Sequence, residues 1–259
     1  MMRPPRFLKT QSVTKTLKTL ATGKALVAGL VLTTSLLLPT LAIAGDDSDY
    51  LPDTSRSGGS RGCSTRTSPS AESSAALILL TPQQTLGQTI STRPTFAWFV
   101  RDAGSWPMEF RLYEHDLSND QFKLVKEIKD ESFKSAPGIT VLSLSQSVPE
   151  LTPGKRYRWQ VELVCNASRP SGNPFAEAEL EVISPRSELR TSLAGARDRL
   201  NRATLYDQAN LWYDALGLAL TANSDTQLRA FRASLLDKVA LGAAERSELQ
   251  GSTVHQVQR

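Results

Sequence analysis

Short apolar runs alternate with polar positions between residues 76 and 184, and Gly, Pro, Asn and Asp residues separate the runs. Alternation with a period of two predicts β-strands that bury one face. The pattern predicts seven strands: Ala76–Leu80, Thr95–Val100, Met108–His115, Phe122–Ile128, Ile139–Leu144, Lys155–Cys165 and Ala176–Ile183. Seven short strands joined by turn sequences are typical of an antiparallel sandwich of the immunoglobulin or fibronectin type III kind.

The alternation also assigns side chains to the core. Trp98 and Trp159 fall on inward faces, where their main role is to fill the space between two sheets. The segment Leu151–Val161 is similar to the entry of a strand in fibronectin type III sandwiches, where a tyrosine hydroxyl bonds back to the upstream backbone as a tyrosine corner. Tyr157 is the residue predicted to take that role.

A helical period replaces the alternation after Ser184. Apolar residues recur on one helix face from Leu189 to Leu200, again within Leu211–Leu220, and again from Leu228 to Leu235. We therefore predict a small helical segment over residues 185–241, packed on the sandwich domain of residues 76–184. The last residues, 242–259, are polar and are predicted to form a flexible tail.

The first 44 residues have the three parts of a secretory signal peptide: a basic stretch, an apolar run from Ala25, and an Ala42-Ile43-Ala44 end. An uncleaved membrane anchor is the alternative, because ~20 apolar residues can span a bilayer, but Pro39 weakens it. We expect export to the periplasm or the medium, with no membrane span left after cleavage. Residues 45–75 hold few apolar side chains and are predicted to form a disordered polar arm.

Removal of the signal changes the charge of the chain. The full sequence has 30 Lys and Arg against 26 Asp and Glu, a formal charge of +4. Six of the basic residues and none of the acidic ones lie in residues 1–44, so the mature chain has a charge of −2. Because nucleic-acid binding needs clustered positive charge, we expect no nucleic-acid partner. The whole chain has only two His and two Cys, and a structural zinc site takes four such ligands, so we expect no zinc site and no cofactor.

His115 lies between Glu114 and Asp116 at the end of a predicted strand. Neighbouring strand residues point to opposite faces, so the two carboxylates share one face and His115 points away from both. We therefore predict that His115 lies in a solvated turn, and His255 lies in the polar tail. No serine has an evident base, and we expect no deep pocket lined by a carboxylate pair or by a His–carboxylate pair.

Cys63 and Cys165 are the two cysteines of a chain predicted to enter an oxidising compartment. An even number of cysteines in such a compartment indicates a disulfide. The alternative is a redox or nucleophilic pair, but the sequence has no Cys-x-x-Cys spacing. We predict a structural bridge that attaches the polar arm to the end of one strand.

Trp106 lies in a turn between two predicted strands. An exposed indole there could stack on a sugar ring or anchor a partner protein. The alternative, which we favour, is a tryptophan that folds over the end of the core. Trp106 is nevertheless the one candidate for a ligand or partner contact.

The order of these features resembles a cyanobacterial family of exported proteins, domain of unknown function 928. The resemblance is carried by the Arg93–Trp98 strand, by the strand that ends at Val164-Cys165-Asn166, and by the Leu211–Leu216 helix. It implies an exported, bacterial protein but no reaction. We therefore expect a non-enzymatic envelope protein that binds another protein or a surface polysaccharide. A carbohydrate-binding module using Trp106 and an unrecognised hydrolase are the alternatives.

We predict that the mature N-terminus is Gly45, because the Ala42-Ile43-Ala44 end marks the cleavage site. The intact mass of the exported protein, measured by mass spectrometry, should equal that of residues 45–259. A mass that retains residues 1–44 would mean that the segment stays as an anchor.

Overall fold

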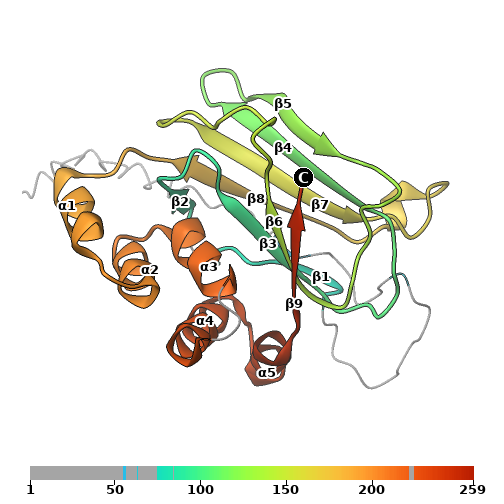
Figure 1. Ribbon diagram of the computed structural model, residues 1–259. Helices are drawn as coiled ribbons and strands as arrows, with labels where there is room; N and C mark the ends of the chain where they lie inside the picture. The colour runs from blue at the N-terminus through green and yellow to red at the C-terminus, as the bar shows by residue number, and fades with distance from the viewer. Residues whose placement is uncertain (1–54, 57–62, 64–74, 84, 222–224) are drawn as a thin grey trace, which may run out of the picture. The chain divides into compact units, whose positions relative to one another are not determined.

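Two β-sheets form the larger part of the structure, a computed structural model that describes residues 55–56, 63, 75–83, 85–221 and 225–259. The predicted signal peptide and most of the predicted arm lie outside the described residues. Sheet A has the strand order β1-β3-β6-β9, and sheet B has the order β2-β8-β7-β4-β5 (Figure 1). The strands are β1 Leu77–Leu79, β2 Gly87–Thr89, β3 Thr95–Val100, β4 Met108–Asp116, β5 Gln121–Ile128, β6 Gly138–Ser143, β7 Arg156–Leu163, β8 Phe175–Val182 and β9 Val254–Gln258.

All seven predicted strands are present, with no end displaced by more than two residues. Two strands were not predicted. Both pair in parallel at a sheet edge, β2 with β8 and β9 with β6, so the expectation of a wholly antiparallel structure is wrong. The sequence of β2, Gly-Gln-Thr, is too short and too polar to produce an alternation signal.

Aromatic side chains join the two sheets. The Phe96 ring on β3 lies 5.1 Å from that of Phe110 on β4 and 5.2 Å from that of Trp159 on β7, measured between centroids. Trp98 and Trp159 are completely buried, as their inward positions predict. At the start of β7 the Tyr157 hydroxyl accepts a hydrogen bond from the Thr152 N–H at 2.8 Å, the bond that defines a tyrosine corner.

Five helices follow the sheets: α1 Ser187–Gly195, α2 Arg199–Gln208, α3 Trp212–Thr221, α4 Thr226–Val239 and α5 Ala243–Gly251. Asp198 and Asp225 cap α2 and α4 by accepting backbone N–H bonds. Asn210 lies between α2 and α3 and has a left-handed backbone conformation, with φ of 59°, which separates the two helices. No helix of the described residues is long and apolar enough to cross a membrane.

The C-terminal residues differ from the flexible tail that the sequence predicts. They form α5 and then β9, which lies in register with β6 from Ile139↔Val254 to Ser143↔Gln258 (Figure 1). Backbone pairing with β6 holds β9 in place, and Val254 and Val257 pack half-buried against the core. Because backbone bonds do not depend on side-chain type and only two residues of β9 are apolar, composition did not reveal the strand.

The described part of the predicted arm is also attached to the fold. The Ser55 carbonyl accepts a hydrogen bond from the Leu79 N–H at 2.8 Å. The Arg56 side chain is 9% exposed, pairs with Glu245 of α5 at 2.8 Å, and donates to the Val239 carbonyl. The prediction of disorder therefore fails at these residues, because one buried ion pair supplies the attachment that apolar side chains do not.

Helix α3 connects the helices to the sandwich through two aromatic residues. The Trp212 indole N–H donates to the Leu80 carbonyl at 2.9 Å. The fully buried Tyr213 hydroxyl accepts from the Trp159 indole N–H at 2.9 Å, and burial raises the pKa of Tyr213 to about 12. Gly87 is required beside the ring, because a Cβ there would lie 2.6 Å from the Tyr213 ring.

Substitution of Tyr213→Phe should lower the free energy of unfolding by about 1–3 kcal/mol, because it leaves the buried Trp159 N–H without an acceptor. Chemical denaturation followed by fluorescence measures the change. The matched control is Tyr206→Phe, since the half-buried Tyr206 hydroxyl has no hydrogen bond among the described residues, and it should change stability by less than about 0.5 kcal/mol. Equal effects of the two substitutions would contradict the assignment.

Asp214, in the first turn of α3, should make stability depend on pH. Burial raises its pKa from 3.8 to about 6, although its carboxylate accepts the Ile90 N–H at 3.0 Å. The folded chain therefore holds this proton more tightly than the unfolded chain, so the unfolding free energy should fall as pH rises from about 4 to about 6. Asp214→Asn keeps an acceptor oxygen but cannot ionise, and it should remove this component from a pH series of unfolding curves. An unchanged pH dependence would contradict the prediction.

Candidate functional site

The outer face of sheet B, which points away from sheet A, carries rows of charged side chains. Residues that lie directly opposite on adjacent strands share a face, so β8 brings its glutamates beside the arginines of β7. Arg158 contacts Glu179 at 2.8 Å, and Gln160 donates to Glu177 at 2.8 Å. The alternation that buries one face of these strands thus produces a ladder of ion pairs on the other.

A pocket of about 680 Å³ opens at one end of this outer face. The start of β4, the residues that follow β5 and the loop that follows β7 surround it. Its floor is charged, with Glu109, Arg111 and Glu162, and its lining includes apolar residues such as Pro107, Val164 and Pro170. This pocket is the candidate functional site, because it combines a concave shape, apolar walls and convergent polar groups.

Arg111 organises the floor of the pocket. Its guanidinium pairs with Glu109, with Glu127 at 3.0 Å and with Glu162 at 3.6 Å. Burial alone lowers the pKa of Arg111, but the hydrogen bond to Glu127 and the charge of Glu109 outweigh it, and the pKa is raised. Lys129 also contacts Glu109, at 2.7 Å, and this hydrogen bond raises the pKa of the lysine. Each floor carboxylate thus has a cation within 4 Å, and Arg111 is shared among three glutamates.

The wall formed by the loop after β7 is fixed by Asn173. Its side-chain oxygen accepts the N–H groups of Cys165 and Asn166, each at 3.1 Å, and its amide donates to Glu162 at 2.7 Å. The same loop carries the disulfide between Cys63 and Cys165, whose Cα atoms lie 4.9 Å apart and which closes a separation of 102 residues. The disulfide therefore anchors the loop whose residues Val164, Ala167 and Pro170 line the pocket.

The carboxylates of this pocket correct one expectation from the sequence. The sequence predicted no deep pocket lined by a carboxylate pair, yet Glu109 and Glu162 lie directly opposite each other on β4 and β7 and both line this pocket. Their side chains are 9% and 16% exposed. The order of strands in the sheet brings them together, and the alternation of each strand alone does not contain that order.

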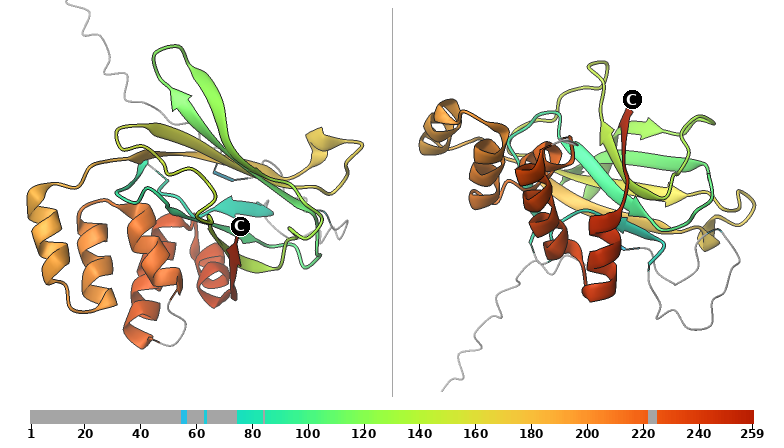
Figure 2. Two further views of the ribbon diagram at one scale, coloured as in Figure 1. Left: turned by 45° about the horizontal axis from the view of Figure 1, so that its top comes forward. Right: turned by 60° about the horizontal axis from the view of Figure 1, so that its bottom comes forward.

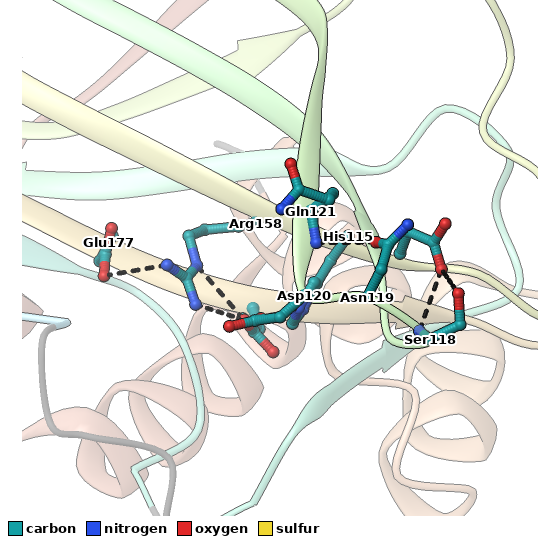
Figure 3. Close-up of polar contacts among 9 residues, drawn as sticks. His115, Ser118, Asn119, Asp120, Gln121, Arg158 and Glu177 are labelled. Atoms are coloured by element: carbon teal, nitrogen blue, oxygen red, sulfur yellow. Dashed lines mark hydrogen bonds and ion pairs between the residues drawn. The ribbon is translucent and has the colours of Figure 1, made fainter.

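His115 is not in a solvated turn, which is a second correction. It lies at the other end of the outer face, near the β4–β5 turn (Figure 3). Its ring is stacked on Phe122 with centroids 4.3 Å apart, and its Nε2 and Nδ1 lie 2.8 Å from Asp120 and 3.3 Å from Glu179. The Arg158 guanidinium covers the other side of the Phe122 ring, 4.1 Å from its centroid. Phe122, on the neighbouring strand, supplies the burial that the sequence of β4 did not indicate.

This cluster lacks a nucleophile positioned for catalysis. Ser118 lies in the same turn, but its hydroxyl donates to Asp116 at 2.7 Å rather than to His115 (Figure 3). Glu114 contacts Lys155 at 3.3 Å, so neither sequence neighbour of His115 contacts the imidazole, as the alternation predicted. Asp120 has a left-handed backbone with φ of 53°, and its bond to His115 ties the turn to the sheet. The geometry indicates a structural cluster.

Trp106 is folded onto its own loop. Its indole N–H donates to Asp102 at 3.1 Å, and its backbone N–H donates to the Ser135 hydroxyl at 2.9 Å. A Cβ at Gly104 would clash with the indole, so the ring lies against this glycine. Half-buried and hydrogen-bonded, Trp106 does not present a free platform for a ligand.

Candidate metal ligands are scattered. Within the residues that the structure describes, no group of three His, Cys, Asp or Glu side chains is arranged to hold a metal ion. His255 lies on β9, where its Nε2 lies 2.9 Å from the Pro137 carbonyl oxygen.

The sequence did not predict the pocket. The one available signal was the polar, outward position of Glu109, Arg111 and Glu162 on their strands.

Three solved structures show weak similarity to the chain. An LPMO from Kitasatospora papulosa is 12% identical over 41% of this chain and 55% of its own, with a TM-score of 0.27, so the match spans about half of that protein. The sensor domain of the anti-sigma factor RsgI4 of Pseudobacteroides cellulosolvens is 12% identical over 42% and 94%, with a TM-score of 0.24. Astrotactin-2, a vertebrate-specific perforin-like membrane protein, is 11% identical over 67% and 38%, with a TM-score of 0.27. Likenesses this low carry no inference about function.

No curated protein matches the chain. One family model does match, over residues 56–249, which include both sheets up to β8 and the helices through most of α5. The chain therefore belongs to the family described as Domain of Unknown Function (DUF928).

Proposed function

We propose that this protein is an exported, non-enzymatic binding protein of the cyanobacterial cell envelope, with a sandwich of the immunoglobulin or fibronectin type III kind. The signal-like N-terminus supports export, and the disulfide suits an oxidising compartment. The tyrosine corner of Tyr157 supports the sandwich type. The ligand site of this proposal is the pocket on the outer face of sheet B.

The observation that carries the binding role is the pairing of every floor carboxylate with a cation. A general acid must hold a proton and a nucleophile must be free to attack. Glu109 is held by Arg111 and Lys129, and Glu162 by Arg111 and Asn173. Such a floor supplies orientation and hydrogen bonds to a ligand, but no unpaired acid or base.

The same pairing favours an uncharged polar ligand. An anion would face Glu109 and Glu162, and a cation would compete with Arg111 and Lys129 for them. A hydroxyl group can donate to a carboxylate and accept from a cation at once, without disturbing the charge balance. The apolar residues Pro107, Val164 and Pro170 of the pocket lining suit the C–H faces of a sugar ring, so we take a neutral segment of a surface polysaccharide as the ligand.

The paired carboxylates also favour a second candidate, a glycoside hydrolase. Glu109 and Glu162 are neighbours on facing positions of adjacent strands, and glycoside hydrolases use such a pair of carboxylates. Under this alternative, the chain hydrolyses the oligosaccharide that it binds. Glu109→Gln and Glu162→Gln would then each abolish turnover while leaving binding in place.

The pocket can be tested by filling it. Ala167 is exposed on the pocket wall, so Ala167→Trp should block the pocket without disturbing the core. Calorimetric titration with maltotriose, cellotriose and tri-N-acetylchitotriose should show binding of at least one trisaccharide by the natural protein and at least about tenfold weaker binding by the variant. Chromatography of the same mixtures should show no hydrolysis.

Ala103→Trp is the matched control, since Ala103 is equally exposed in a loop and does not line the pocket. It should bind the trisaccharide as the natural protein does. Equal binding by both variants, or no binding by the natural protein at millimolar concentrations, would reject the pocket as a sugar site. Hydrolysis that disappears with Glu162→Gln would replace the binding role with the enzymatic one.

A further inference from the structure

Helices α1 and α2 and the residues beside them carry an exposed cluster of arginines. Five arginines lie within 17 consecutive positions, and all five are exposed: Arg186, Arg190, Arg197, Arg199 and Arg202. None of them pairs with a carboxylate in the part of the chain that the structure describes. We call these five residues the arginine surface.

Most arginines elsewhere in the fold have a carboxylate partner, although Arg169, Arg229 and Arg232 have none among the described residues. Seven have such a partner within 4 Å: Arg56, Arg93, Arg101, Arg111, Arg158, Arg246 and Arg259. The two acidic residues that lie within the arginine surface are already engaged. Asp198 caps α2 by accepting the Asn201 N–H at 2.7 Å, and Glu188 accepts hydrogen bonds in the first turn of α1, which lower its pKa. These two carboxylates offset part of the charge, and residues 186–202 keep a net charge of +3, from five arginines against one Glu and one Asp.

Packing does not explain these arginines. Helix α1 buries none of its residues, and α2 buries only Ala203. Figures 1 and 2 show α1 at the end of the row of helices, with α2 between it and α3, so α1 is the helix farthest from the sheets. Almost any polar residue is compatible with folding at these exposed positions, so folding does not explain why arginine recurs there.

The chemistry of arginine points to an anionic partner. A guanidinium presents a rigid fork of donors that matches carboxylate, sulfate and phosphate oxygens, and it stays charged at any physiological pH. Five such groups spread over two helices and their connecting turn suit an extended polymer with repeated anionic groups. A single small anion would contact only one or two of them.

An anionic membrane is the other possible partner, and the apolar residues argue against it. Helices that bind bilayers insert large apolar side chains between the headgroups. Among the described residues, the exposed large apolar side chains are Leu117, Phe122, Leu124, Phe175 and Leu241, and none lies in α1 or α2. The leucines of α1 are half-buried, so this surface offers charge without an apolar anchor.

We propose that the arginine surface binds an anionic polysaccharide, with guanidinium groups contacting carboxylate or sulfate groups along the polymer. The choice of a polysaccharide over other polyanions rests on the envelope location in the proposed function, whereas the surface itself does not depend on the sugar pocket. The protein would then contact surface polysaccharide at two places, through neutral sugar in the pocket and through acidic groups at the helices.

The test uses the exported chain. Labelled polygalacturonate and labelled dextran sulfate are the acidic probes, and neutral dextran and phosphatidylglycerol vesicles are the comparisons. Fluorescence anisotropy should show binding to at least one acidic polymer that weakens at least about tenfold between 50 and 500 mM NaCl, because salt screens the charges. The triple variant Arg190→Gln, Arg199→Gln, Arg202→Gln should bind at least about tenfold more weakly, since it removes three charge-assisted contacts. Neutral dextran should not bind.

A control variant removes the same net charge elsewhere: Lys123→Gln, Lys126→Gln, Arg169→Gln, on β5 and in the loop after β7. It should keep polymer binding within about twofold, and both triple variants should retain the natural melting temperature and trisaccharide binding. Equal loss in the two variants, binding insensitive to salt, or binding to vesicles but to neither acidic polymer would overturn the proposal. Because trisaccharide binding is measured on the same samples, failure of the pocket and failure of the arginine surface are distinguishable.

Discussion

The buried hydrogen bond between Trp159 and Tyr213 joins the sheets to the helices, and much of the structure depends on it. Trp159 is a core residue of β7, and Tyr213 enters from α3, 54 residues later in the chain. The two rings also contact Phe96, so all three lie within one aromatic core. A polar pair buried this deeply must be fully satisfied. The helical segment is therefore part of the folding unit rather than an appendage.

Outward-facing residues of the sheets do not contribute to this core and can be polar or charged. Once the inward positions of β4 and β7 fill the core, their outward positions form the charged floor of the pocket. Asn173 and the Cys63–Cys165 disulfide hold the loop that forms one wall. On the helices, α3 provides the packing, which leaves α1 and α2 with exposed positions for arginines. Both proposed binding surfaces lie at positions that are not needed to fill the core.

The sequence predicts the local elements well and the partners of those elements poorly. Alternation predicts β3 and β7 because apolar residues must face the core. The turn sequence before β7 identifies Tyr157 as the tyrosine-corner residue. It does not reveal that β9 joins β6, because backbone bonds carry that pairing. Nor does it show that Glu109 and Glu162 meet, or that Phe122 covers His115, since both depend on which strands are neighbours.

The central claim is that sheets and helices form one cooperative unit through the aromatic core. Hydrogen exchange measured residue by residue tests it most directly. The account predicts that amides of α3 and of β7 exchange with the same free energy of opening, equal to that of global unfolding. If the amides of α3 exchange through an opening that leaves β7 protected, the helices fold separately and the account is contradicted.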